Sequence, residues 1–210
     1  MKLYLCFFFC FGLMASPLEW TKLKEKDGIS TFKKDLPNGA LISFKGIGTV
    51  KASLKKVFNI IMDTQRAPEW VADMEKSQVL DWVKKPHTYI EYNHIKMPLI
   101  IKDRDFISKV NMIKESDKTI LINYSTTDHK VNSKNIRGEI NGSYFRLTAL
   151  GENETLIEGV VICDPKGLIP KWIVNLFQKN WPYDTISGIR KQALKKDLIE
   201  DPRYDDYFFN

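Results

Sequence analysis

Cysteine is scarce in this sequence, and its placement excludes a disulfide framework. Only Cys6, Cys10 and Cys163 occur in 210 residues. The first two lie in an apolar leader that we expect to be removed, which leaves Cys163 alone. The mature domain must therefore be held together by its apolar core rather than by disulfides.

Motifs typical of metal-binding, phosphate-binding and catalytic sites are also missing. His87, His94 and His129 show no metal-ligand spacing, and Cys163 has no paired cysteine. The sequence contains no glycine-rich phosphate loop and no Gly-x-Ser-x-Gly elbow. We therefore expect a non-catalytic protein with no metal and no cofactor, although a Cys163–His nucleophilic pair stays open on residue count alone.

Linkers, repeats and low-complexity segments are absent as well. Hydrophobic residues make up 43% and charged residues 28%, which is typical of a globular domain. The net charge of +6 is not concentrated in basic runs with interleaved aromatics, so we do not expect nucleic acid as a partner. One monomeric domain over residues 17–210 is predicted.

The first sixteen residues are typical of a signal peptide. A short positive start is followed by an apolar stretch, Leu3 to Met14, and by the small pair Ala15-Ser16. The apolar stretch is too short to span a bilayer, which needs about 20 residues. Residues 1–16 are therefore predicted to be a signal peptide and the mature protein to be exported.

Three glycosylation sequons bear on the compartment. They begin at Asn123, Asn141 and Asn153, and the first two fall in predicted strands, where a glycan would be hard to accommodate. This favours a host that does not glycosylate. We expect a protein of the bacterial periplasm, or a secreted one.

Alternation of apolar and polar residues, bounded by turn residues, predicts an antiparallel sheet. Short polar connectors join most of the strands, and short turns make neighbouring strands antiparallel. Glycines within residues 41–50 indicate bulges or a close backbone approach. The predicted strands are residues 20–24, 29–33, 41–50, 78–83, 88–95, 105–113, 119–126, 136–150 and 155–163.

Helical spacing replaces alternation in two places. Ser53 is a predicted N-cap of a helix, and a second short helix carries Pro68 in its first turn and includes Trp70. Near the end of the chain, Pro170 predicts the first turn of a long helix that Pro182 should kink. A sheet with an apolar concave face needs a cover, and only this last helix is long enough. The fold class predicted is α+β, a helix-grip fold with a curved antiparallel sheet wrapped around a long C-terminal helix and an internal cavity.

Several short stretches occur in a recognisable order. They are Asp27-Gly28-Ile29, Asp63, Trp70, Arg104-Asp105-Phe106, Ile136-Arg137 and, most clearly, the run DPKGLIPKWIVN at 164–175. Together they resemble the START (steroidogenic acute regulatory protein-related lipid transfer) domain family over essentially all of residues 17–210. Lys179-Asn180 with Pro182 is similar to the phosphatidylcholine transfer protein branch. The resemblance implies a lipid-binding tunnel under the last helix and no catalysis.

The resemblance also assigns the family's ligand-binding positions to residues of this chain. The choline-binding aromatics of the family fall on Tyr92, Phe106 and Asn141, which leaves two aromatics for a partial cation–π site. The Arg and Asp that hold the headgroup fall on Ala67 and Val71.

A buried Glu and Arg of the sterol-transfer members fall on Asn93 and Val110, so neither charge is kept. The resemblance therefore implies a lipid without naming it. The predicted cavity residues are Trp70, Tyr92, Asn93, Phe106, Val110, Asn141, Phe177, Trp181, Thr185 and Ile189.

Two of these predictions have structural alternatives. The aromatic stripe of Trp172, Phe177 and Trp181 is more often core than tunnel wall. Arg104 and Arg137 could bind a lipid phosphate, because a guanidinium matches that geometry. The interpretation we favour for both arginines is ion pairing near the sheet rim.

The segment 96–102, Lys-Met-Pro-Leu-Ile-Ile-Lys, is unusually apolar for a loop. We predict a lid formed by Met97, Leu99, Ile100 and Ile101 that closes the cavity and dips into a bilayer during exchange. Burying each large apolar side chain would contribute roughly 1.5–3 kcal/mol and each flanking lysine about 1 kcal/mol at an anionic surface, which suits transient docking. A loop packed permanently on the helix is the alternative.

The function predicted is binding of a single lipid or other apolar ligand, such as a phospholipid, a sterol or a fatty-acid-like molecule. The protein would carry, transfer or sense this ligand and contact a membrane transiently. One alternative is a helix-grip enzyme of the cyclase type, with Glu91 or Tyr92 as its acid or base. Strand alternation places Glu91 and Tyr92 on opposite faces, so the two cannot act together. A module that binds a protein partner through an outer apolar patch is a further alternative.

Overall fold

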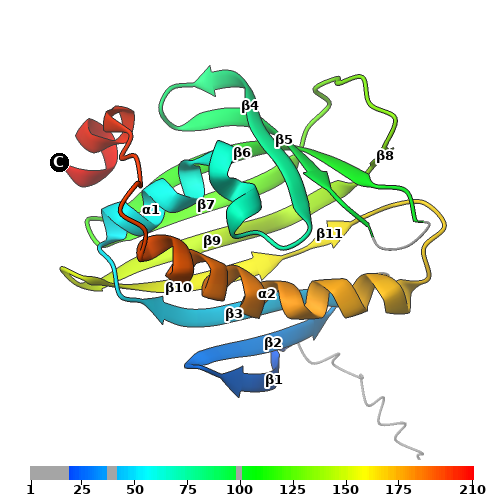
Figure 1. Ribbon diagram of the computed structural model, residues 1–210, viewed down its shortest axis with the longest axis horizontal. Helices are drawn as coiled ribbons and strands as arrows, with labels where there is room; N and C mark the ends of the chain where they lie inside the picture. Colours follow the sequence, from blue (N-terminus) through cyan, green and yellow to red (C-terminus); the bar gives the residue numbers. More distant parts are fainter. Residues whose placement is uncertain (1–18, 37–41, 98–100) are drawn as a thin grey trace, which may run out of the picture.

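The computed structural model describes residues 19–36, 42–97 and 101–210, without the side chains of Lys171 and Phe177. The predicted signal peptide lies outside the described residues. Figure 1 shows a broad curved sheet with helices gathered on one of its faces.

The described residues form one eleven-stranded sheet that is antiparallel along its main path. Its order is β1-β2-β3-β10-β9-β7-β6-β5-β4, and two short strands lie off this path, β8 parallel to β6 and β11 antiparallel to β9. The bounds are β1 Thr21–Lys26, β2 Ile29–Asp35, β3 Ile42–Val50, β4 Met74–Lys84, β5 Thr88–Ile95, β6 Arg104–Ser116, β7 Thr119–Thr126, β8 Ile136–Arg137, β9 Glu139–Gly151, β10 Glu154–Val161 and β11 Cys163–Asp164.

The N-terminal half of the helical layer forms where the sequence predicts it. Helix α1 (Leu54–Met62) begins after Ser53, whose side chain accepts a hydrogen bond from the backbone N–H of Lys56 at 3.2 Å. The 3-10 helix η2 (Thr64–Glu69) follows and contains Pro68, whereas Trp70 is its C-cap. Trp70 therefore lies just beyond the short helix rather than inside it.

The long helix α2 (Lys171–Ala193) lies across the sheet face and is a single helical element through Pro182. It can approach closely because a glycine on β3 lies beneath it. A Cβ added at Gly46 would come within 2.8 Å of Pro182 Cβ and 3.1 Å of the Pro182 carbonyl oxygen. The glycine-rich strand thus marks a close helix–sheet contact, as its composition predicts.

The apolar core lies where the C-terminal half of α2 meets α1 and the sheet. Ile186, Ile189 and Ala193 on α2 are buried there with Val57 and Phe58 on α1. None of the helices among the described residues is long and apolar enough to cross a membrane.

A C-terminal tail, which the sequence did not predict as structured, completes this core. It contains the 3-10 helix η3 (Pro202–Tyr204) and the π-helical turn η4 (Asp205–Phe209). Tyr204 and Phe208 are buried, and their rings lie 5.0 and 5.1 Å from the ring of Phe58 on α1. Figure 1 shows the tail beside α1, at one end of the helical layer.

The prediction of an α+β helix-grip fold is therefore confirmed. A curved antiparallel sheet and a long C-terminal helix enclose the interior of the domain.

Candidate functional site

A cavity of about 580 Å³ lies between the sheet and the N-terminal half of α2. Strand alternation supplies one wall, because Glu91, Asn93 and Ile95 of β5 all project to the same face. The residues that line the cavity are Ile61, Ala67, Trp70, Val71, Ala72, Asp73, Met74, Glu91, Asn93, Ile95, Lys96, Met97, Arg104, Phe106, Tyr124, Ile140, Ser143, Tyr144, Phe145, Val160, Val161, Cys163, Pro165, Val174, Leu176, Gln178, Asn180, Trp181 and Asp184.

Aromatic rings make up much of the apolar wall. Trp181 on α2 lies over Phe145 on β9 with ring centroids 5.7 Å apart, and Tyr124 meets Phe145 edge-on at 6.2 Å. Phe106 on β6 and Trp70 extend this surface toward the segment that follows η2. Such a wall suits an apolar ligand.

One carboxyl group lies within this wall. Glu91 is 6% exposed, and its Oε1 accepts a hydrogen bond from Ser77 Oγ at 2.8 Å, whereas Oε2 is buried without a partner among the described residues. Burial raises the pKa of Glu91 to about 7, and the hydrogen bond from Ser77 and the nearby Asn93 side chain oppose this rise. Burial, with a smaller contribution from the charge of Glu91, also raises the pKa of Tyr124 well above its ordinary value.

Arg104 is held by backbone carbonyls. Its Nε donates to the oxygen of Pro165 at 3.1 Å, Nη2 donates to the oxygen of Lys166 at 3.0 Å, and Nη1 donates to the oxygen of Lys102. Desolvation lowers the pKa of this buried guanidinium. The predicted ion pairing of Arg104 near the sheet rim is therefore wrong. Arg104 instead ties the segment before α2 to the start of β6.

Cys163 lines the cavity but has none of the features of a nucleophile. Gln178 Nε2 on α2 lies 3.1 Å from its Sγ and donates to its carbonyl oxygen at 3.0 Å. Burial raises the pKa of the Cys163 thiol to about 12, so the thiolate is scarce at neutral pH.

Of the cavity residues named from the sequence, four line the cavity: Trp70, Asn93, Phe106 and Trp181. The other described ones are placed elsewhere. Val110 and Ile189 are fully buried in the core, Thr185 is buried beside it, Asn141 is exposed on β9, and Tyr92 projects to the opposite face of β5. The side chain of Phe177 lies outside the described residues.

The positions that correspond to the choline-binding aromatics of the family do not converge. Phe106 lines the cavity, but the Tyr92 hydroxyl donates to Asp105 Oδ1 at 2.8 Å, away from it. Ala67 and Val71, where the family has its headgroup Arg and Asp, do line the cavity but carry no charge. The partial cation–π site is thus not assembled.

The predicted lid is described only in part. Met97 lines the cavity and Ile101 is half-buried, whereas Leu99 and Ile100 lie outside the described residues. Arg137 does not line the cavity; its Nη2 donates to the Val131 carbonyl oxygen at 3.5 Å, and it makes no ion pair within the described part of the chain.

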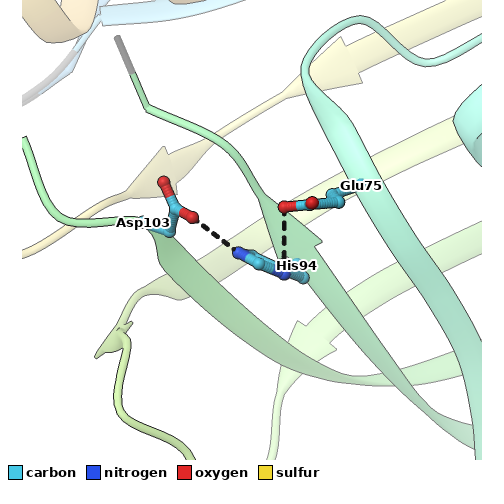
Figure 2. A group of neighbouring side chains, drawn as sticks. All are labelled: Glu75, His94 and Asp103. Carbon is cyan, nitrogen blue, oxygen red and sulfur yellow. Dashed lines mark hydrogen bonds and ion pairs between the residues drawn. The ribbon is translucent and has the colours of Figure 1, made fainter. Parts of the chain in front are cut away.

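One cluster that the sequence did not predict lies at the base of this segment. His94 Nε2 lies 2.9 Å from Asp103 Oδ2, and its Nδ1 lies 3.6 Å from Glu75 Oε2 (Figure 2). The three ligand-bearing atoms lie within 4.8 Å of one another. Because the two carboxylates face different ring nitrogens, the arrangement is that of a polar network joining β4, β5 and the residue before β6 rather than of ligands converging on one metal ion.

A second hollow of about 660 Å³ lies between α1, β4 and the C-terminal tail. Its polar groups pair with one another. Asn59 Oδ1 accepts the N–H of Asp201 at 2.8 Å, and the Asp201 carboxylate pairs with Arg203. None of its described lining side chains has a buried polar atom without a partner, in contrast to the cavity under α2.

The START domain family model matches residues 15–195 of this chain. The chain belongs to the START family. Membership implies binding of a lipid or other apolar ligand, and it agrees with the position of the cavity beneath α2. The match does not distinguish branches, so the likeness to the phosphatidylcholine transfer protein branch stays a prediction.

Two solved structures share the fold of this START domain. A STAR-related lipid transfer protein from Xanthomonas axonopodis is 19% identical, with a TM-score of 0.74, over 84% of this chain and 99% of its own. Human StAR-related lipid transfer protein 5 is 17% identical, with a TM-score of 0.75, over 83% of this chain and 86% of its own. An uncharacterised protein from Pseudomonas aeruginosa is 22% identical over 89% of this chain and 93% of its own length.

An enzyme also shares the architecture of this START domain. An aromatase/cyclase from a Streptomyces species is 11% identical, with a TM-score of 0.51, over 72% of this chain and 92% of its own. This likeness shows only that the fold can host either binding or chemistry.

Proposed function

We propose that this protein binds one lipid or similarly apolar molecule in the cavity under α2 and carries, transfers or senses it. The observation that carries this proposal is the 580 Å³ cavity, whose wall is mostly apolar in surface and partly aromatic. Its volume falls in the range of roughly 300–1,000 Å³ that accommodates one small-molecule ligand. Apolar burial supplies the affinity, and the polar groups orient the ligand.

Exchange at a membrane is the route we propose for loading. Trp172, at the start of α2, is 68% exposed, and Leu168 and Leu176 are exposed near it, while Leu176 also lines the cavity. The carbonyls of Lys102 and Pro165 both bind Arg104, so this apolar surface lies beside the end of the predicted lid segment. Lid opening at a bilayer, ligand entry and closure would complete the cycle. The proposal includes export as a monomer.

Identification of a bound ligand tests the proposal directly. The full chain should be expressed in its native host or a close relative, purified, extracted with organic solvent and analysed by mass spectrometry. A lipid recovered in a one-to-one ratio supports the carrier function. A protein that yields no lipid and takes none up from phosphatidylcholine–phosphatidylglycerol vesicles would contradict it.

A cyclase-type enzyme is the second candidate, and Glu91 is the observation that favours it. A cavity carboxyl with a pKa of about 7 could act as a general acid or base at neutral pH. Tyr92 cannot assist it, because Tyr92 projects to the other face of β5. Incubation of the extracted ligand with fresh protein decides between the two, because an enzyme returns a chemically altered ligand and a carrier returns it unchanged.

A further inference from the structure

Glu91 is placed in the cavity wall with half of its hydrogen-bonding capacity unused. Ser77 on the neighbouring strand β4 occupies Oε1 at 2.8 Å, and Oε2 is buried without a partner in the described part of the chain. Buried carboxylate oxygens in native proteins nearly always have a partner. The missing partner is therefore expected from something that enters the cavity.

Two polar side chains near Glu91 also have buried atoms without a hydrogen-bond partner. Asn93 lies two residues along β5 on the same face, and its buried Oδ1 also lacks a partner. Ser108 on β6 lies opposite Glu91 in the strand register, and its fully buried hydroxyl is unpartnered too. Figure 1 shows that β4, β5 and β6, which carry these residues, are adjacent strands at one end of the sheet. Above the Glu91 pKa of about 7 the carboxylate is ionised, and the unsatisfied atoms on Glu91 and Asn93 are then both acceptors, so this pair of atoms requires a donor.

The protein supplies no cation to this cluster within the described residues. Of the two cations that line the cavity, Arg104 binds the carbonyls of Lys102, Pro165 and Lys166 instead. The other, Lys96, is not among the groups that shift the pKa of Glu91. Among the described residues, no cation contributes to the shift in the pKa of Glu91. A lone buried carboxyl without a counter-charge repels an anionic group and attracts a hydrogen-bond donor.

We propose that the ligand of this cavity ends in a hydrogen-bond donor, a hydroxyl or an amine, that binds Glu91 Oε2 and Asn93 Oδ1, and that ligands ending in a carboxylate or phosphate are rejected. The inference rests on the proposed function, since it names the class of ligand for the same cavity. A donor there satisfies two buried acceptors at once, whereas an anion would face Glu91 at close range in a water-poor site.

Matched single-chain probes test this class of ligand. Dodecanol, dodecylamine, dodecanoic acid and dodecyl phosphate share one apolar chain and differ only at the polar end. Each would be titrated against the full-length protein at pH 8 in competition with the apolar dye Nile red. We expect dodecanol or dodecylamine to bind at least about tenfold more tightly than both anionic probes. The order of the two donor probes tells whether the hydroxyl or the amine is preferred.

Two variants separate the carboxyl from the cavity itself. Glu91→Leu should keep Nile red binding and lose the tenfold preference, and it is expected to fold because it removes an unpaired buried carboxyl. Glu152→Gln is the control, since Glu152 is an exposed carboxylate in the turn between β9 and β10, outside the cavity, and its loss should leave the preference unchanged. Circular dichroism would confirm that both variants are folded.

The outcomes are distinguishable. Equal binding of donor and anionic probes by the wild type, or an undiminished preference in Glu91→Leu, overturns the donor assignment while leaving the lipid carrier intact. Failure of Nile red and all four probes to bind the wild type removes the proposed function, and the donor assignment with it.

Discussion

Asp103 Oδ1 accepts the backbone N–H of Met97 at 2.9 Å. The first residue of the predicted lid is thereby fixed to the residue that precedes β6. The other carboxylate oxygen of Asp103 pairs with His94 Nε2 at the end of β5, as Figure 2 shows. Both ends of the segment between β5 and β6 are therefore tied to one carboxylate.

Asp103→Asn should lower the free energy of unfolding at pH 7 by roughly 1 kcal/mol, because the charge that strengthens both hydrogen bonds is lost. The hydrogen bonds from Met97 and His94 lower the pKa of Asp103. A lowered pKa means that the contribution is present above the unfolded-state pKa of about 3.9 and is lost as the pH falls through the folded-state value. Urea denaturation at pH 7 and at pH 3 would check this, and an equal deficit at both values would contradict it.

The contribution of Glu91 to the stability of the fold should depend on pH in the opposite direction. Burial raises its pKa from 4.5 to about 7, so the folded protein without ligand favours the protonated form. Its contribution is fully present below the unfolded-state pKa and is lost as the pH rises through about 7, by roughly 3 kcal/mol at most. Glu91→Gln should therefore gain stability relative to the wild type between pH 5 and pH 8. Thermal melts of delipidated protein would reveal this, and a difference that does not change with pH would refute it.

Leu168→Asp should slow lipid transfer between vesicles, because it places a charge on the exposed apolar surface beside the cavity. Leu150→Asp is the control, since Leu150 is an exposed leucine at the far end of β9. Fluorescence transfer assays should show a reduction of severalfold for the first and little change for the second. Equal rates for both variants would place membrane contact elsewhere.

Phe208→Ala should lower the free energy of unfolding by about 3–5 kcal/mol, because it removes a buried ring packed on Phe58. Tyr207→Ala, at a half-exposed neighbour, should cost much less. Urea denaturation of both variants measures the difference. Similar costs would mean that the tail is not part of the core.

Gly46→Ala should be destabilising by roughly 1–3 kcal/mol, since the new methyl group would meet Pro182 of α2 at 2.8 Å. A Cβ at Gly151 meets no atom within 4 Å, so Gly151→Ala serves as the control. The midpoints of thermal unfolding would compare them, and an unshifted midpoint in Gly46→Ala would show that α2 can move away.

Local sequence pattern predicts much of this fold. Strands 88–95 and 119–126 have the predicted bounds, because alternation and flanking turns act over a few residues. Strand β4 starts earlier than predicted, at Met74, since its pairing with β5 contains register shifts that interrupt the alternation. The tail escaped prediction because Tyr204 and Phe208 follow no strand or helix period of sufficient length.

The local sequence pattern could not tell which inward-facing residues line the cavity and which belong to the core. Val110 and Phe106 lie on the same face of β6, yet the first is in the core and the second lines the cavity. That difference depends on where α1 and the C-terminal half of α2 fill the interior, which is set by tertiary packing. Glu91 was not among the predicted cavity residues; the available signal was its position two residues before Asn93 on an alternating strand, which puts both on one face.

Phe58 and Phe208 are separated by 150 positions and yet share one aromatic cluster. During synthesis on the ribosome, the apolar side of α1 stays uncovered until residues 204–209 have emerged. The domain can therefore close its core only late, after every described strand of the sheet has been made. A nascent chain paused before this point would present that uncovered surface to chaperones.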